Sequence, residues 1–176
     1  MINDSSKPSK IMIFGLSGSG KSTFALLLSK LLQIQVYHLD KYFFTCNWVE
    51  RDYAEFLEFQ ENFVNQDSWI IDGNNLKSLE MRWKRADLVI FFNYPLYICY
   101  FRVLKRFLFP DKAIDDRAEG CNETIKWSLL KYMWGYKDRI KEQINFLKDK
   151  YPNAYFIEIR NESDLKNLKT YFQNIN

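Results

Sequence analysis

One short segment near the N-terminus carries the strongest chemical signal in the chain. Residues 15–22, GLSGSGKS, match the pattern G-x-x-x-x-G-K-[ST] at every fixed position. Glycines let the backbone wrap around a phosphate with its N–H groups pointing inward, and the following helix directs its partly positive N-terminus at the same anion. The segment therefore predicts a phosphate-binding loop, or P-loop, for ATP.

The side chains of this loop have distinct expected roles. Lys21 reaches the β- and γ-phosphates, and the Ser22 hydroxyl is a ligand of Mg²⁺. ATP and Mg²⁺ are therefore the expected cofactors. The nucleotide-binding residues expected in the loop are Gly15, Ser17, Gly18, Ser19, Gly20, Lys21, Ser22 and Thr23.

Two carboxylates follow apolar runs and are expected at the same edge of a sheet. Asp72 closes the run 69–71, where it can orient the water shell of Mg²⁺; the alternative is an aspartate that merely begins a turn. Asp40 ends a second expected strand, where it can accept the proton of an acceptor hydroxyl, unless it is a helix cap or turn residue. His38, the only histidine, is expected to be structural.

Arginines supply the expected positive charge. Arg102 and Arg106 are four residues apart, so they share one face of the helix expected after Pro95, where they can bind the γ-phosphate or stack on the base. A solvated basic face is the alternative. Arg117 lies in a lid-like loop, and Arg82 is a weaker candidate for holding an anionic acceptor. The expected catalytic residues are Lys21, Asp40, Arg102, Arg106 and Arg117.

Alternating elements are expected to position these residues. Strands are expected at 10–14, 35–39, 69–71, 87–92 and 154–159. Helices are expected at 21–32, 51–66, 76–84 and from 95 to about 107, then as one long helix capped by Asn122, and finally after a cap at Asn161 or Ser163. This order predicts a three-layer α/β P-loop NTPase fold, whose five-stranded parallel sheet is covered by helices on both faces.

Length and composition indicate one domain. The 176 residues favour a single P-loop domain at 10–176 after a disordered tail at 1–9, with a lid-like loop at 109–121. Three widely spaced cysteines argue against a disulfide framework and a zinc site. No signal peptide or membrane span is visible, so a cytoplasmic location is expected. The net charge of +3 suits polyanionic small molecules and allows weak DNA association.

The chain resembles the adenylate-kinase-like P-loop kinases in the Asp72-Gly73 pair and in the run 86–95 with Arg102 and Arg106 after it. That resemblance implies that Arg102 packs on adenine and that Arg106 contacts phosphates. The chain is most similar to the DNA topology modulation (FlaR-like) proteins, a kinase-like ATPase subfamily without an assigned reaction. The matching residues are Leu39, Asp40, Trp48, 69–74, Arg82, Ala86, Asp87, 118–121 and Glu123.

Two departures bear on the substrate. Asn74-Asn75 stands where adenylate kinases bind an acceptor phosphate, and Ile114 stands where the subfamily tends to carry an arginine. The stretch 40–43 is similar to the Asp-x-Phe/Tyr pattern of nucleoside kinases, which favours a hydroxyl acceptor. The aromatic segment from Tyr42 to Trp48 is expected to line the acceptor pocket and to shield Asp40 partly from water.

Three functions compete at this point. The first is a kinase that transfers the γ-phosphoryl group of Mg-ATP to a nucleoside, a nucleotide or a related small acceptor. The second is a regulatory ATPase that acts on DNA topology or a protein partner, although the chain has no dedicated DNA-binding module. The third is a nucleotide-binding protein without turnover, against which Lys21, Ser22 and Asp72 together argue. The oligomeric state stays open.

Overall fold

A single parallel sheet forms the centre of the molecule. The computed structural model describes residues 7–109, 118, 120–121 and 127–175. The strands are β1 (Lys10–Gly15), β2 (Val36–His38), β3 (Trp69–Asp72), β4 (Leu88–Phe92) and β5 (Tyr155–Ile159), in the order β2-β3-β1-β4-β5 with every pair parallel. The expected five-stranded parallel sheet is confirmed.

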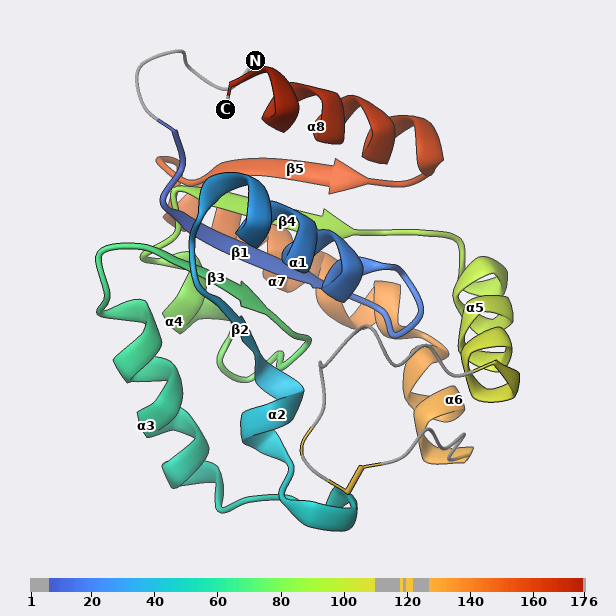
Figure 1. Cartoon of the computed structure of the whole chain (residues 1–176). Helices are drawn as coiled ribbons and strands as arrows, with labels where there is room; N and C mark the ends of the chain where they lie inside the picture. The colour runs from blue at the N-terminus through green and yellow to red at the C-terminus, as the bar shows by residue number, and fades with distance from the viewer. Residues whose placement is uncertain (1–6, 110–117, 119, 122–126, 176) are drawn as a thin grey trace.

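Helices cover both faces of the sheet. In Figure 1, α1 lies in front of the sheet, α7 runs behind it, and α8 lies along the edge strand β5. None of the helices in the described ranges is long and apolar enough to cross a membrane. The helices are α1 (Lys21–Leu32), α2 (Leu39–Phe43), α3 (Tyr53–Val64), α4 (Leu79–Trp83), α5 (Leu96–Leu108), α6 (Trp127–Met133), α7 (Tyr136–Lys150) and α8 (Glu162–Asn174), with a 3₁₀ turn at Cys46–Trp48.

The central strands form the core because helices shield them on both sides. β3 and β4 are buried at every position, and β1 is buried from its second residue onward. Near-continuous apolar runs of this kind are typical of parallel strands that bury both faces. The strand register brings the end of β1, Asp72 of β3 and His38 of β2 to the same edge of the sheet.

The second strand is shorter than expected, which corrects the placement of Asp40. Its last pair is His38 with Asp72, the residue at which β3 also ends. Residues after His38 therefore have no neighbouring strand to bond, and they turn into α2 instead. Asp40 lies in the first turn of this helix and not at the end of a strand.

The expected long helix is two helices. α6 ends at Met133 and α7 begins at Tyr136, because Gly135 takes a left-handed conformation with φ of 68°. Arg139 donates hydrogen bonds to the carbonyl of Trp134 at 3.0 Å and to the carbonyl of Tyr132, so the break is held by side-chain bonds. The expected cap, Asn122, lies outside the described residues.

Side-chain caps begin two other helices. Asp52 accepts hydrogen bonds from the N–H groups of Ala54 and Glu55 at the start of α3. Asn161, one of the two expected candidates, accepts from the N–H of Asp164 at 2.9 Å and begins α8.

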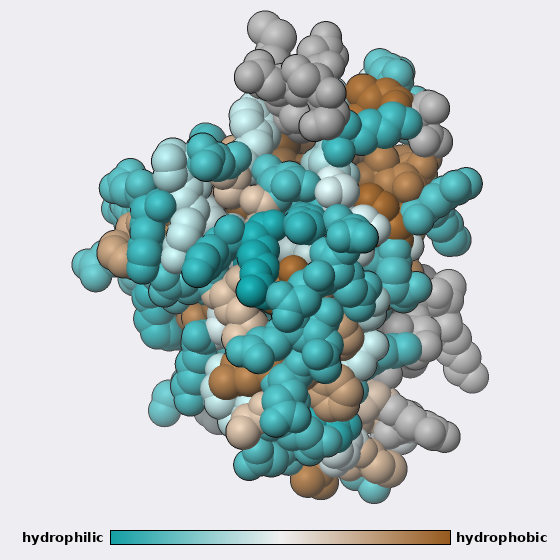
Figure 2. Space-filling model, turned by 90° about the vertical axis from the view of Figure 1, so that its left-hand side faces the viewer, coloured by the Kyte–Doolittle hydropathy of each residue, from teal (hydrophilic) through white to brown (hydrophobic). Residues whose placement is uncertain are grey.

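Hydrophilic residues cover most of the face that carries α3 (Figure 2).

Candidate functional site

The P-loop connects β1 to α1 and rests against α5. Gly18 has a φ of 75°, and a Cβ there would lie 2.5 Å from the carbonyl oxygen of Cys99 and 3.0 Å from the Val103 side chain. Glycine is therefore required both for the left-handed backbone and for the approach of α5. The turn is closed by a hydrogen bond from the Ser19 N–H to the Leu16 carbonyl at 3.2 Å.

The loop fits a bound phosphate. Ser19 is fully buried, and its hydroxyl oxygen has no hydrogen-bond partner among the described residues. A buried polar atom normally has a partner, and a phosphate oxygen can supply one here. Ser17 is partly exposed, and Thr23 is exposed in the first turn of α1. The N–H groups of this turn are available to an anion because a helix leaves its first four unpaired.

Asp72 is buried at the carboxyl end of β3, next to the P-loop. Its Oδ2 accepts a hydrogen bond from His38 Nδ1 at 2.8 Å, and its side chain is only 3% exposed. Burial alone raises the pKa of this carboxyl group, but the Lys21 ammonium, His38 and Ser22 together outweigh burial and lower the pKa below its usual value. Asp72 is therefore ionised at neutral pH.

These groups fit a magnesium ion. Oδ1 of Asp72 has no hydrogen-bond partner among the described residues, and the Ser22 hydroxyl is close enough to the carboxylate to help lower its pKa. Mg²⁺ prefers hard oxygen ligands and is usually held by one or two protein side chains, several waters and substrate phosphates. A hydroxyl and an ionised carboxylate beside the P-loop are such a donor set, so Ser22 and Asp72 would hold the ion.

Replacement of Asp72 by asparagine tests this assignment. Asp72→Asn removes the buried charge but keeps the shape, so the Mg²⁺ concentration for half-maximal turnover should rise about 10- to 100-fold. Binding of Mn²⁺ in the presence of ADP, measured by electron paramagnetic resonance, should weaken to a similar extent. Asp67→Asn, at the opposite end of β3, is the matched control. Unchanged Mn²⁺ binding in a folded Asp72→Asn variant would contradict the assignment.

Arg102 ties three elements together beside the P-loop. It donates to the Ser19 carbonyl at 3.1 Å, pairs with Glu162 at the start of α8, and lies 4.6 Å from the centre of the Tyr94 ring. Burial and the neighbouring Glu162 carboxylate raise the pKa of Tyr94 to about 12, so its hydroxyl stays protonated and donates to Glu162 at 3.1 Å. Arg102 is thus held beside the P-loop.

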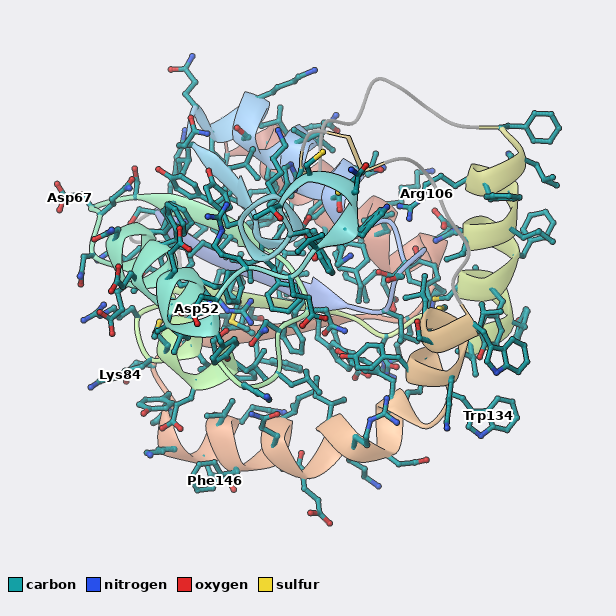
Figure 3. The ribbon with its side chains drawn as sticks, turned by 90° about the horizontal axis from the view of Figure 1, so that it is seen from below. Asp52, Asp67, Lys84, Arg106, Trp134 and Phe146 are labelled. Atoms are coloured by element: carbon teal, nitrogen blue, oxygen red, sulfur yellow. The ribbon has the colours of Figure 1, made fainter. Side chains whose placement is uncertain are left out.

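The second arginine lies on the same inward side of α5. Arg106 is half-buried, and it points from α5 back toward the body of the molecule (Figure 3). Arg117, the residue expected in the lid-like loop, lies outside the described residues. The described end of that segment is anchored, because the Cys121 thiol donates to the Thr45 carbonyl at 3.3 Å and accepts from the Trp48 N–H at 3.2 Å.

A polar cluster that sequence reasoning missed follows Asp72. Asn74 donates from Nδ2 to the Tyr132 hydroxyl at 3.1 Å and accepts at Oδ1 from the Tyr136 hydroxyl at 2.5 Å. Burial raises the pKa of both tyrosines, and Asp40 raises that of Tyr132 further, which places Asp40 beside the cluster. In the sequence, Tyr132 and Tyr136 were indistinguishable from core positions of a helix.

Two expectations about the acceptor side need correction. Arg82 is fully buried, and it donates to the carbonyls of Gly73 at 3.0 Å and Asn75 at 2.6 Å, so it holds the loop after β3 and is not free to clamp an acceptor. Burial lowers its pKa to about 10, which still leaves it charged at neutral pH. Asp40 is exposed, although the aromatic segment after it was expected to shield it from water.

That aromatic segment packs elsewhere. The Tyr42 ring lies 4.7 Å from the Phe63 ring, and the Phe43 ring lies 5.1 Å from the Phe56 ring, so both rings contact α3. His38 was expected to be structural, and it also contacts Asp72, the candidate magnesium ligand. The pairing of β2 with β3 that creates this contact cannot be predicted from one sequence.

Comparison with solved structures supports the fold described above. No protein-family model matches the chain, and a search of curated proteins found no match. Among solved structures, shikimate kinase from Acinetobacter baumannii in complex with shikimate has a TM-score of 0.53 at 15% identity and covers 94% of each chain. Shikimate kinase from Bacteroides thetaiotaomicron has a TM-score of 0.52 at 15% identity and covers 95% of this chain and 99% of its own.

A third solved structure, deoxyadenosine kinase from M. mycoides with products dcmp and dcdp, has a TM-score of 0.50 at 15% identity and covers 94% of this chain and 99% of its own. All three are kinases by name, and the alignments extend over almost the whole chain. The chain therefore has the three-layer α/β fold of the P-loop kinases.

Proposed function

We propose that this chain is an ATP-dependent kinase that transfers the γ-phosphoryl group of Mg-ATP to a hydroxyl group of a small acceptor such as a nucleoside. The observation that carries the proposal is the meeting of Lys21, Ser22 and the ionised, buried Asp72 beside a glycine loop whose Ser19 hydroxyl has no hydrogen-bond partner in the described part of the chain. This combination suits a Mg-nucleotide with a transferable phosphoryl group. Since such an enzyme consumes ATP, we place it in the cytoplasm.

On the nucleotide side, the backbone N–H groups of the P-loop bind the β-phosphate, and Lys21 bridges to the γ-phosphate. Phosphoryl transfer depends mainly on positioning and on stabilising the charge that develops on the equatorial oxygens. Lys21 and Arg106 supply that positive charge, with Arg117 as a further candidate. Arg102, fixed against the P-loop by its bond to Ser19, flanks the base. A Mg²⁺ ion held by Ser22 and Asp72 would neutralise part of the phosphate charge.

On the acceptor side, the described groups suit a hydroxyl better than a phosphate. An acceptor phosphate needs cations, but the guanidinium of Arg82 is committed to backbone carbonyls. The cluster of Asn74, Tyr132 and Tyr136 offers neutral donors and acceptors instead, with the Asp40 carboxylate beside it. Asp40 takes the proton from the acceptor hydroxyl. The hydroxyl oxygen forms the new bond to the γ-phosphorus as the bond between that phosphorus and ADP breaks. The names of the structural neighbours, kinases of shikimate and deoxyadenosine, agree with this class of reaction.

A substrate panel tests the proposal. The intact protein is incubated with Mg-ATP and, separately, nucleosides, nucleoside monophosphates, small alcohols and duplex DNA, and the release of ADP is followed. We expect stimulation by an acceptor with a free hydroxyl and little stimulation by the corresponding monophosphate. Stimulation only by DNA would instead assign the chain to the regulatory ATPases, and stimulation only by monophosphates would overturn the hydroxyl acceptor.

A further inference from the structure

Helix α5 has an outer face that the proposed activity does not use. Its inner face carries the buried Cys99 and Val103 and contacts the P-loop. On its outer face four large apolar side chains are at least half exposed: Tyr97 (73%), Phe101 (66%), Leu104 (50%) and Leu108 (59%). Their spacing of four, three and four residues forms one continuous stripe along the helix, of the kind by which one helix packs on another.

Further aromatic side chains extend this apolar surface. Phe109, which directly follows α5, is 72% exposed, and Trp127 and Trp134 of α6 are 80% and 71% exposed. α6 lies beside α5, since the Tyr100 hydroxyl donates to the Leu130 carbonyl at 2.9 Å. Figure 3 shows Trp134 pointing away from the sheet on the side of the molecule that carries α5. The stripe and these three residues are called the α5 face below.

The α5 face is large enough for a stable interface. It includes five aromatic side chains, each at least 66% exposed. Since an aromatic side chain buries roughly 150–250 Å² when fully covered, covering these five would bury on the order of 700 Å². A standard protein interface buries about 800 Å² per partner, and monomers rarely leave a contiguous apolar patch of this size exposed.

We propose that the α5 face binds a second copy of this chain, with the two α5 helices antiparallel across a twofold axis. The four-three-four spacing reads the same in both directions, so an axis between Phe101 and Leu104 maps the stripe onto itself, as a symmetric dimer requires. The axis places Phe101 on the partner's Leu104 and Tyr97 on the partner's Leu108. Each large ring then meets a smaller leucine, which favours close packing.

Charge favours the antiparallel arrangement over a parallel one. Residues 96–109 contain no acidic side chain, and the exposed Lys105 flanks the stripe. A parallel pair would bring the two Lys105 ammonium groups to the same level of the seam. The antiparallel pair separates them along the helix axis.

Sedimentation velocity of the intact protein at micromolar concentrations tests the proposal. We expect a species of twice the 21.3 kDa chain mass. The double variant Phe101→Glu with Leu104→Glu should be a monomer with an unchanged circular dichroism spectrum. Phe146→Glu is the matched control, because Phe146 of α7 is 56% exposed and lies well away from Trp134 in Figure 3. A wild-type monomer, an aggregate of undefined mass, or loss of the dimer in the control would each overturn the proposal.

Cysteine cross-linking then tests the orientation, in a Cys46→Ser background that removes the exposed native thiol. A mixture of Phe101→Cys and Leu104→Cys proteins should form the mixed disulfide under mild oxidation by diamide. Cross-linking of each variant only with itself would contradict the antiparallel pair. Sedimentation with vesicles containing anionic phospholipid is the remaining arm. A monomer that sediments with them through Phe101 and Leu104 would overturn the dimer and assign the α5 face to a membrane surface.

Discussion

Lys21→Ala is expected to reduce kcat by at least about 10³-fold, because the variant loses the cation that contacts the β- and γ-phosphates in the transition state. The substitution also removes the ammonium group that helps to lower the pKa of Asp72, so the magnesium site should weaken at the same time. ATP affinity should therefore fall as well as turnover. Turnover is measured by ADP release, and affinity by isothermal titration calorimetry with Mg-ADP.

Lys30→Ala is the matched control for this prediction. Lys30 is an exposed lysine in the last turn of the same helix, so its removal changes the net charge equally without touching the P-loop. It should leave both turnover and nucleotide affinity unchanged. A well-folded Lys21→Ala variant that binds Mg-ADP with normal affinity would contradict the P-loop assignment.

Asp40→Asn is expected to cut kcat by about 10²- to 10⁴-fold while leaving ATP binding intact, because general-base catalysis contributes in this range. Asparagine has nearly the same shape but does not accept a proton from the acceptor hydroxyl. The measurement compares kcat and nucleotide affinity of the variant with wild type, using the acceptor found in the substrate panel. The pH dependence of kcat should also change, because ionisation of the Asp40 carboxyl group no longer contributes to it.

Asp149→Asn is the control here, since Asp149 is likewise an exposed aspartate but lies at the C-terminal end of α7, thirteen residues after Tyr136 of the polar cluster. Near-normal kcat in Asp40→Asn would show that Asp40 is structural. The acceptor group would then be assigned as a phosphate, because transfer to a phosphate needs no general base.

Most of the fold could be predicted from the sequence because its signals are local. The apolar runs of β3 and β4 are typical of strands at the centre of a parallel sheet. The start of α1 follows from the glycine loop, and its observed bounds, Lys21–Leu32, equal the predicted ones. The confirmed strands placed Asp72 at the carboxyl edge of the sheet, where the P-loop also lies.

The errors arose where long-range packing overrides local pattern. The end of β2 depends on where β3 ends, so Asp40 was placed on a strand although it lies in a helix. Arg82 reads as an accessible cation, but the fold buries it against the carbonyls of the loop after β3. Gly135 could have indicated the break between α6 and α7. Its left-handed backbone ends the helix there, although the residues on both sides have helical spacing.

The most direct test of the kinase assignment follows the fate of the γ-phosphoryl group itself. The protein is incubated with Mg²⁺, ATP labelled with ³²P at the γ-position, and the acceptor mixture, and the products are separated by thin-layer chromatography. We predict that the label appears in a phosphate ester of a hydroxylated small molecule, in an amount equal to the ADP formed, and that Lys21→Ala abolishes it. Label recovered only as inorganic phosphate with every acceptor tested would contradict the account.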